Sequence, residues 1–247
     1  MSGSATRESQ DLAGVTAVLL AGGRGSRLST VLADRPKVLA HVQGRPFLAY
    51  LLDQVAAHGV GEVVISTGYL GGQVKDTFGD SYHGLRLVYS HESSPLGTAG
   101  ALRRALPLLK SDSVLVMNGD SICKVALKAF WDRHCARGAN ATLLLAKMSE
   151  TTRYGRVDVD DEGHVLGFQE KKRVHGGGWV NAGIYLIRRH FIGEIPAQKA
   201  VSLEREVFPN WIGNGLYGYK GTGHFLDIGT PAAYARAGQF FLREELV

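Results

Sequence analysis

Residues 19–39 read LLAGGRGSRLSTVLADRPKVL, in which an apolar run leads directly into a glycine cluster followed by closely spaced basic residues. At Gly22, Gly23 and Gly25 the missing Cβ lets backbone N–H groups approach phosphate oxygens. The basic residues, which can neutralise phosphate charge, are Arg24, Arg27, Arg35 and Lys37. This pattern predicts a phosphate-binding turn after a buried strand. An ordinary strand-to-helix turn with solvated arginines is the alternative.

Two common nucleotide-binding motifs do not fit this stretch. It lacks the GxxxxGK[ST] pattern of P-loop proteins, and GGRGSR lacks the third glycine at the spacing of dinucleotide-binding folds. Phosphate binding here would therefore follow another pattern.

Working outward, short apolar runs alternate with segments of helical period, as expected where helices cover a parallel sheet. The predicted strands are 16–21, 62–67, 85–90, 113–118 and 141–146. The predicted helices are 46–59, 71–78, 97–109 and 125–138. These elements predict an α/β fold of the Rossmann-like, doubly wound type with a mostly parallel sheet.

The pattern changes after about residue 150. Residues 155–171 alternate apolar and polar side chains around a DDEG turn, which predicts an antiparallel hairpin. Beyond it we expect a strand at 179–187, a helix at 202–213, an extended segment at 216–221 and a terminal helix at 231–246. The sequence thus predicts a disordered N-terminus over 1–15 and a single domain over 16–247 with an antiparallel C-terminal elaboration.

Composition narrows the class of protein. Of 247 residues 45% are hydrophobic and 21% charged, which excludes a disordered chain. The net charge of +5 suits anionic small substrates without requiring nucleic acid. No apolar run is long enough to span a membrane and no secretory signal is visible, so we expect a cytoplasmic protein with no membrane partner. Cys123 and Cys135 are expected to be buried thiols.

The glycine loop resembles the signature of a known family. GGRGSRL (22–28) followed by PKVL (36–39) is similar to the GGxGTRL and PKPL of sugar-1-phosphate nucleotidyltransferases. Further family-like segments follow in order: ESSPLGTAGAL (92–102), VMNGDS (116–121), FQEK (168–171), WVNAGIY (179–185) and FLDIGTP (225–231). The resemblance covers nearly the whole chain from Thr16. The chain departs from the family pattern at Ser26 (usually Thr), Val38 (usually Pro) and Phe225 (usually Trp). Val38 matters most because it adjoins Lys37.

The resemblance implies a reaction between two anions. An oxygen of a sugar 1-phosphate attacks the α-phosphorus of a nucleoside triphosphate, releasing pyrophosphate and a nucleotide sugar. Arg27 and Lys37 would contact the triphosphate and stabilise charge at the α-phosphate, while Arg24 and Arg35 fit a solvated surface equally well. The nucleotide site implied by the resemblance comprises Leu20, Ala21, Gly22, Gly23, Gly25, Ser26, Glu92, Gly97, Thr98 and Ala99.

A divalent metal is the expected cofactor. Asp120 closes a predicted central strand at its carboxyl end, where open α/β sheets place ligands, and Asp227 lies in FLDIGTP. Two carboxylates converging on phosphate oxygens suit Mg²⁺, and the resemblance assigns both to the metal. Either aspartate taken singly could instead cap a helix.

The resemblance also implies a sugar phosphate site. Its members would be Gly155, Glu170, Lys171, Asn181 and Gly183. Glu170 would accept hydrogen bonds from sugar hydroxyls and Lys171 would bind the phosphate.

Glu92 bears on the choice of base. Family members that use uracil or thymine commonly have Gln here, whereas a carboxylate only accepts and can pair with the N1–H and N2 donors of guanine. We therefore expect GTP, although Glu92 could be a solvated loop residue with backbone groups near Gly97 and Thr98 reading the base. PLGTAGAL with NGDS resembles the guanylyltransferase branch that uses mannose-configured substrates, including D-glycero-α-D-manno-heptose 1-phosphate.

Several alternatives remain open at this stage. Within the family they are a mannose-1-phosphate guanylyltransferase and a glucose-1-phosphate thymidylyl- or uridylyltransferase. In a different class, a nucleotide-sugar-dependent glycosyltransferase would be expected to carry a DxD-like motif, whereas NGDS offers a single Asp. A regulatory subunit would be expected to have lost Lys37, Asp120 or Asp227. The resemblance further implies a role in capsule or lipopolysaccharide synthesis and a possible homodimer.

Overall fold

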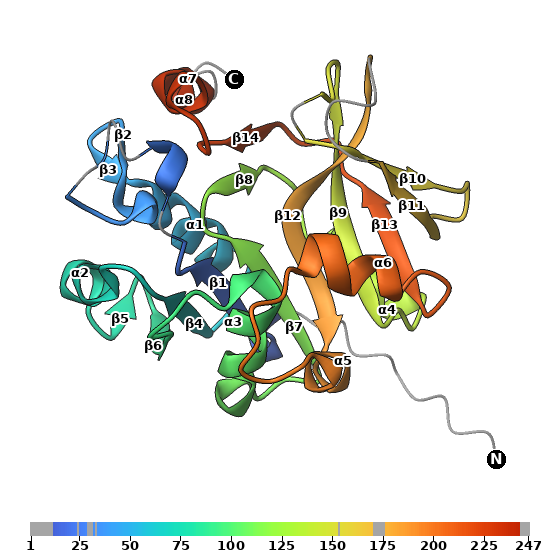
Figure 1. The fold of residues 1–247 in the computed structure, drawn as a ribbon, viewed down its shortest axis with the longest axis horizontal. Coiled ribbons are helices and arrows are strands. Elements are labelled where there is room, and N and C mark those ends of the chain that lie inside the picture. Colours follow the sequence, from blue (N-terminus) through green and yellow to red (C-terminus); the bar gives the residue numbers. More distant parts are fainter. Residues whose placement is uncertain are drawn as a thin grey trace.

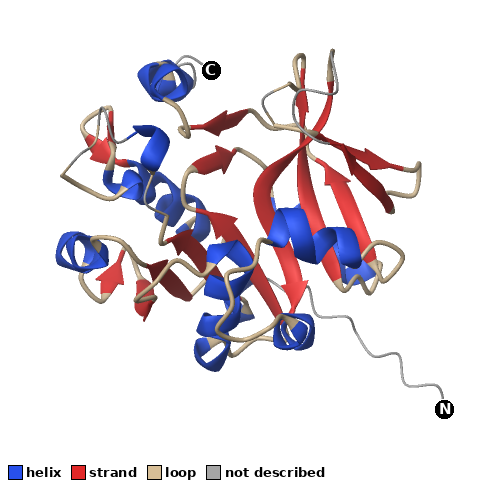
Figure 2. Cartoon of the chain, in the orientation of Figure 1, coloured by secondary structure: helices blue, strands red, loops and turns tan. Residues whose placement is uncertain are grey.

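The computed structural model describes residues 12–23, 25–28, 32, 34–152, 154–169 and 176–242. An eight-stranded sheet runs through the molecule in the order β13-β9-β12-β7-β1-β4-β6-β5 (Figure 1). Helices lie on both of its faces (Figure 2). The mixed α/β class expected from the sequence, with a largely parallel central sheet, is confirmed.

The parallel part of the sheet contains the strands that the apolar runs predict. They are β1 (Thr16–Ala21), β4 (Glu62–Thr67), β6 (Leu85–His91) and β7 (Ser113–Asn118). β1 lies between β4 and β7 and is parallel to both. The carboxyl ends of all four strands therefore meet at one edge, where the glycine loop begins.

The later strands extend the sheet and partly reverse its direction. β12 (Gly178–Arg188) is antiparallel to both β7 and β9 (Ala141–Met148), and β13 (Leu216–Lys220) is parallel to β9. The predicted hairpin forms from β10 (Arg156–Val159) and β11 (Val165–Gln169). Two short strands not predicted from the sequence, β8 (Ser121–Cys123) and β14 (Phe225–Asp227), pair antiparallel.

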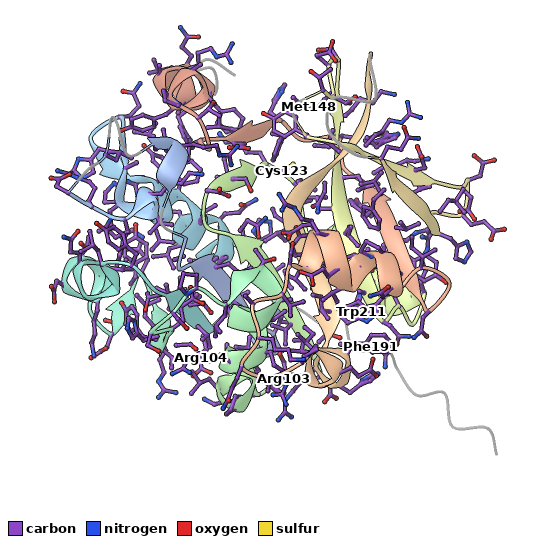
Figure 3. All side chains as sticks on the ribbon, viewed as in Figure 1. Arg103, Arg104, Cys123, Met148, Phe191 and Trp211 are labelled. Atoms are coloured by element: carbon purple, nitrogen blue, oxygen red, sulfur yellow. The ribbon has the colours of Figure 1, made fainter. Side chains whose placement is uncertain are left out.

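Successive residues of β1 point into two different cores. Ala17, Leu19 and Ala21 pack into one core with α1 (Phe47–Ala56), α2 (Gly71–Phe78) and α4 (Leu127–Ala136). Val18 packs into the other with α3 (Gly97–Ala105), α5 (Arg189–Glu194) and α6 (Phe208–Asn210). The rings of Phe191 and Trp211, labelled in Figure 3, pack edge to face at 4.9 Å and join α5 to the α6 segment. Burial on both faces explains why residues 17–21 of β1 are continuously apolar.

Short elements complete the described chain. They are 3₁₀ turns at Leu12–Gly14, Ser26–Leu28, Lys37–Leu39 and Leu106–Leu108, the strands β2 (His41–Val42), β3 (Arg45–Pro46) and β5 (Ser81–Tyr82), and a π-helical turn at Leu203–Val207.

Several boundaries differ from the expectations. The described chain begins before Thr16 with the Leu12–Gly14 turn, in which Leu12 is buried. The expected terminal helix is two helices, α7 (Pro231–Ala235) and α8 (Ala237–Leu242), and residues 243–247 lie outside the described chain. The 202–213 segment winds as the π-helical turn followed by α6 rather than as one α-helix.

The two cysteines differ in their surroundings. Cys123 is buried and burial raises the pKa of its thiol to about 11, whereas Cys135 is exposed. The expectation of two buried thiols is therefore wrong for Cys135, because α4 turns its neighbour His134 inward and Cys135 outward.

No helix within the described ranges has the length and apolar character needed to cross a bilayer.

Candidate active site

The glycine loop begins at the carboxyl end of β1, next to the end of β7. The N–H of Gly119 donates to the Leu20 carbonyl at 3.0 Å, which joins the two strand ends. Gly25 has a φ of +61°, and a Cβ built there would lie 3.1 Å from the Lys37 Cβ. Glycine at position 25 thus permits both the left-handed turn and the close approach of Lys37.

Lys37 and Asp120 form an ion pair at this edge. Lys37 Nζ lies 2.6 Å from Asp120 Oδ2, and the Lys37 side chain is 10% exposed against 38% for Asp120. Val38 is buried, and a Cβ added to Gly119 would come within 2.8 Å of its Cγ1. The valine that replaces the family's second proline therefore packs on the strand end that carries Asp120.

The pairing of β8 with β14 places Asp227 next to Asp120. Asp227 is opposite Ser121 in the antiparallel register, and the Ile228 N–H donates to the Asp120 carbonyl at 3.0 Å. Asp227 Oδ1 accepts a short hydrogen bond from the Gly229 N–H. The two aspartates, 107 positions apart in sequence, thus lie on neighbouring backbone segments.

Arg27 reaches the same place from the glycine loop. A Cβ built at Gly229 would lie 2.5 Å from Asp227 Oδ1 and 3.3 Å from Arg27 Nη2. Arg27, Lys37, Asp120 and Asp227, singled out separately in the sequence, therefore gather at one end of the parallel strands.

This donor set fits a hard divalent cation. Among the described residues, Lys37 bonds to Asp120 Oδ2 and the Gly229 N–H bonds to Asp227 Oδ1, so both carboxylates keep acceptor positions that could bind a metal. A separate acidic group, Asp160, Glu162 and His164, lies at the turn of the β10–β11 hairpin and within metal-ligand spacing, but on a different part of the sequence from the aspartate pair.

Glu92 lies beneath the glycine loop rather than in solvent. It is 9% exposed, and its Oε2 accepts a hydrogen bond from the Leu96 N–H at 3.2 Å. Its Oε1 occupies the space in which a side chain at Gly22 would lie, because a Cβ there would be 2.5 Å away. Burial raises the pKa of the Glu92 carboxyl, and the hydrogen bond from Leu96 opposes this shift.

The start of α3 is covered by the segment that precedes the π-helical turn. The N–H of Ala99 donates to the Val201 carbonyl at 2.9 Å, and a Cβ at Gly97 would lie 2.5 Å from that same oxygen. The Thr98 hydroxyl donates to Glu204 Oε2 at 2.7 Å and accepts from the Leu203 N–H at 2.8 Å. The Thr98 side chain is thus engaged by the protein itself.

β12 brings Asn181 and Gly183, two of the predicted sugar-site residues, beside β8, the strand that follows Asp120. Gly183 has a φ of +74° at an irregularity in the β12–β9 pairing, and a Cβ there would lie 2.7 Å from Ser121 Oγ. The Gly183 N–H donates to Asn181 Oδ1 at 2.8 Å, so both residues lie next to the segment that follows Asp120.

Gly155 is carried towards the same region by its neighbour Tyr154. The rings of Tyr154 and Phe225 pack edge to face with centroids 5.4 Å apart, which joins the Gly155 loop to β14. Phe225, which replaces the family's tryptophan, keeps this aromatic contact.

Glu170 and Lys171 lie outside the described residues, as does Arg24, and the Ser26 side chain is likewise not described. Arg35 pairs with Asp34 at 2.9 Å rather than with the residues above.

Glu204 and its partners were missed by the sequence reasoning. Glu204 lies in the LEREV turn, whose charges are typical of a solvated helix, yet its carboxylate is hydrogen-bonded to Tyr185 and Asn118. The available signal was the pair of polar residues, Asn118 and Tyr185, inside otherwise apolar strands, since buried polar groups require partners.

Comparison with known proteins identifies the family. The model of the family described as "Nucleotidyl transferase" matches residues 16–244.

The chain belongs to the nucleotidyl transferase family.

Two curated relatives of this nucleotidyl transferase are guanylyltransferases. A mannose-1-phosphate guanylyltransferase of Mycobacterium tuberculosis is 36% identical over 93% of this chain, and the chain spans 65% of that relative's length. A D-glycero-alpha-D-manno-heptose 1-phosphate guanylyltransferase of Aneurinibacillus thermoaerophilus is 34% identical over 90% of this chain and 96% of its own length. The expectation of a sugar-1-phosphate nucleotidyltransferase is confirmed.

A solved structure of the family has the same fold. The crystal structure of HddC from Yersinia pseudotuberculosis, complexed with GMP-PN, superimposes with a TM-score of 0.82 at 29% identity. The match covers 92% of this chain and 99% of that one.

Proposed function

We propose that this nucleotidyl transferase transfers a guanylyl group from GTP to D-glycero-α-D-manno-heptose 1-phosphate, releasing pyrophosphate and forming a GDP-heptose. The observation that carries the proposal is the meeting of Lys37, Asp120 and Asp227 at the strand ends, below the loop that contains Arg27. Guanylyl transfer is further supported by two curated relatives and by the buried Glu92 carboxylate beside Gly22.

The chain's own residues account for the charge problem of the reaction. Lys37 and Arg27 would place two cations against the triphosphate, which reduces repulsion between the reactants and stabilises charge at the α-phosphorus. The Lys37 ammonium, 10% exposed and held by Asp120, is already oriented before substrate arrives. Mg²⁺ held by Asp120 and Asp227 would supply further charge neutralisation on phosphate oxygens.

The sugar phosphate would lie between β12 and the Gly155 loop. Asn181, Gly183 and Gly155 are the described members of this proposed site, and Glu170 with Lys171 complete it by resemblance. Lys171→Ala is expected to raise the KM for sugar phosphate without raising that for GTP, because its cation would contact the acceptor phosphate.

The proposal is tested by measuring pyrophosphate release with GTP, UTP, dTTP or ATP against heptose, mannose and glucose 1-phosphates in the presence of Mg²⁺. GTP with the heptose 1-phosphate should give the highest kcat/KM, and Asp120→Asn should abolish the signal. Highest activity with mannose 1-phosphate would assign the substrate of the Mycobacterium tuberculosis relative instead. Preference for dTTP or UTP with glucose 1-phosphate would refute guanylyl transfer.

A nucleotide-sugar-dependent glycosyltransferase is distinguished by its products. Such an enzyme would release a nucleoside diphosphate from a nucleotide sugar and would form no pyrophosphate from GTP.

A further inference from the structure

Glu204 receives hydrogen bonds from four side chains. Its Oε2 accepts from the Thr98 hydroxyl at 2.7 Å and from the Ser202 hydroxyl at 2.9 Å. Its Oε1 accepts from the Tyr185 hydroxyl at 3.1 Å and from Asn118 Nδ2 at 3.4 Å. A carboxylate offers about four lone-pair positions, so these donors leave none for a substrate.

The two oxygens of this carboxylate face different parts of the site. Oε2 is anchored at the start of α3, where Thr98 is itself held by the Leu203 N–H at 2.8 Å. Oε1 bridges the carboxyl end of β7, through Asn118, to β12, through Tyr185. Asn118 comes two residues before Asp120, so this one side chain joins the segments that carry the proposed nucleotide, metal and sugar residues.

The charge of Glu204 sets the direction of the bonds beyond it. A carboxylate cannot donate, so the Tyr185 O–H must point at Oε1 and the Tyr185 oxygen is left as an acceptor. That oxygen accepts from Asn181 Nδ2 at 3.0 Å, and Asn181 Oδ1 accepts from the Gly183 N–H at 2.8 Å. Tyr185 is fully buried, which raises the pKa of its hydroxyl and keeps the proton on it.

We infer that Glu204 is a positioning residue for the sugar phosphate: through Tyr185 it holds Asn181 Nδ2 in place while the Gly183 N–H holds Asn181 Oδ1, so that Asn181 presents its second Nδ2 hydrogen as a fixed donor. This inference rests on the proposed function, which places the sugar phosphate beside Asn181. Without the carboxylate the Tyr185 hydroxyl can turn, and the hydrogen bond that holds Asn181 Nδ2 is weakened, although the Gly183 N–H still holds Asn181 Oδ1.

Kinetics of Glu204→Gln and Tyr185→Phe test the inference. We expect each variant to raise the KM for sugar 1-phosphate by about tenfold, the scale of one lost hydrogen bond. Tyr185→Phe leaves the Thr98–Glu204 contact in place and should change the KM for GTP by less than about twofold. The double variant should resemble either single variant, because both changes interrupt one chain of bonds. Glu206→Gln is the matched control, since the exposed Glu206 carboxylate accepts from the Ser202 N–H on the same turn and should leave both KM values unchanged.

A second readout does not require turnover. The side-chain ¹⁵N–¹H resonances of Asn181, assigned by their loss in Asn181→Asp, should exchange slowly with water in the wild type and faster in Tyr185→Phe and Glu204→Gln. Tyr185→Phe removes a single hydroxyl, so it decides the question if Glu204→Gln does not fold.

Three results would overturn the inference: unchanged exchange of the Asn181 side-chain protons in both variants, equal increases in the two KM values of Tyr185→Phe, or faster exchange with an unchanged KM for sugar phosphate. A wild type inactive with every sugar 1-phosphate would refute the proposed function and the sugar role of Glu204. In that case the amide exchange would still show whether Glu204 orients Asn181.

Discussion

Lys37 Nζ lies 2.6 Å from Asp120 Oδ2, so a metal ion that binds Asp120 must compete with the ammonium group of Lys37. Lys37→Met is therefore expected to increase the affinity for Mn²⁺ in the absence of nucleotide, on the order of tenfold, because a nearby like charge is removed. The same change should slow turnover, since the cation proposed to act at the α-phosphate is lost.

Manganese binding measured by electron paramagnetic resonance provides the check. Asp120→Asn serves as the control and should abolish the binding. Weaker Mn²⁺ binding by Lys37→Met would show that Lys37 supports the metal site rather than competing for it.

Glu92 is expected to make GTP use sensitive to pH. Burial raises its pKa above the ordinary glutamate value of 4.5, so on acidification it takes up its proton at a higher pH than an exposed glutamate does. Once protonated it no longer accepts two hydrogen bonds from guanine, so the KM for GTP should rise as the pH falls.

Glu92→Gln should remove this pH dependence and narrow the preference for GTP over UTP, by about 1–3 kcal/mol. Steady-state kinetics from pH 5 to 8 would measure both effects, with the exposed Glu194→Gln as a matched control. A variant that kept the wild-type preference for GTP would remove Glu92 from base recognition.

The glycine loop is constrained by the Glu92 carboxylate that packs against it. A Cβ at Gly22 would meet Glu92 Oε1 at 2.5 Å, whereas a Cβ at Gly23 would meet nothing within 4 Å. Gly22→Ala is thus expected to lower the free energy of unfolding by about 1–3 kcal/mol, because the buried carboxylate must move. Gly23→Ala should leave it nearly unchanged.

Urea denaturation of the two alanine variants compares the positions directly. Equal destabilisation of both would mean that the loop as a whole, rather than the contact between Gly22 and Glu92, resists the added methyl group.

For the whole molecule, His134 links stability to pH. It is 2% exposed, with Nδ1 2.8 Å from Thr142 Oγ1, and burial lowers its pKa from 6.5 to about 4. As the pH falls, His134 therefore takes up its proton near pH 6.5 in the unfolded chain but only near pH 4 in the folded chain. The contribution of neutral His134 to the free energy of unfolding is complete above pH 6.5. It is lost as the pH falls, by roughly 3 kcal/mol at most.

Urea denaturation across pH 4 to 8 measures this dependence. His134→Asn should flatten the decline between pH 6.5 and 4, even though it destabilises the protein at neutral pH, whereas the exposed His190→Asn should retain the decline. Identical pH profiles for wild type and His134→Asn would assign acid sensitivity to the carboxylates alone.

Local patterns in the chain determined much of the architecture. β1, β4 and β7 coincide with the predicted 16–21, 62–67 and 113–118, because strands buried on both faces are continuously apolar. The exposed Cys135 and the break between α7 and α8 were not predicted. The exposure of Cys135 depends on which face of α4 packs on the sheet, and tertiary packing rather than the local sequence sets that face.

What the sequence by itself determined is the α/β class, the glycine loop and the family, since each depends on residues that are neighbours along the chain. Only the tertiary structure decided that Lys37 meets Asp120, that β14 carries Asp227 to β8, and that Glu204 holds Thr98 and Tyr185 together. The physical reason is the short range of the interactions that hold these partners together. Hydrogen bonds and ion pairs act over about 3 Å, whereas these partners are separated by up to 106 positions in the chain and meet only after the sheet has formed.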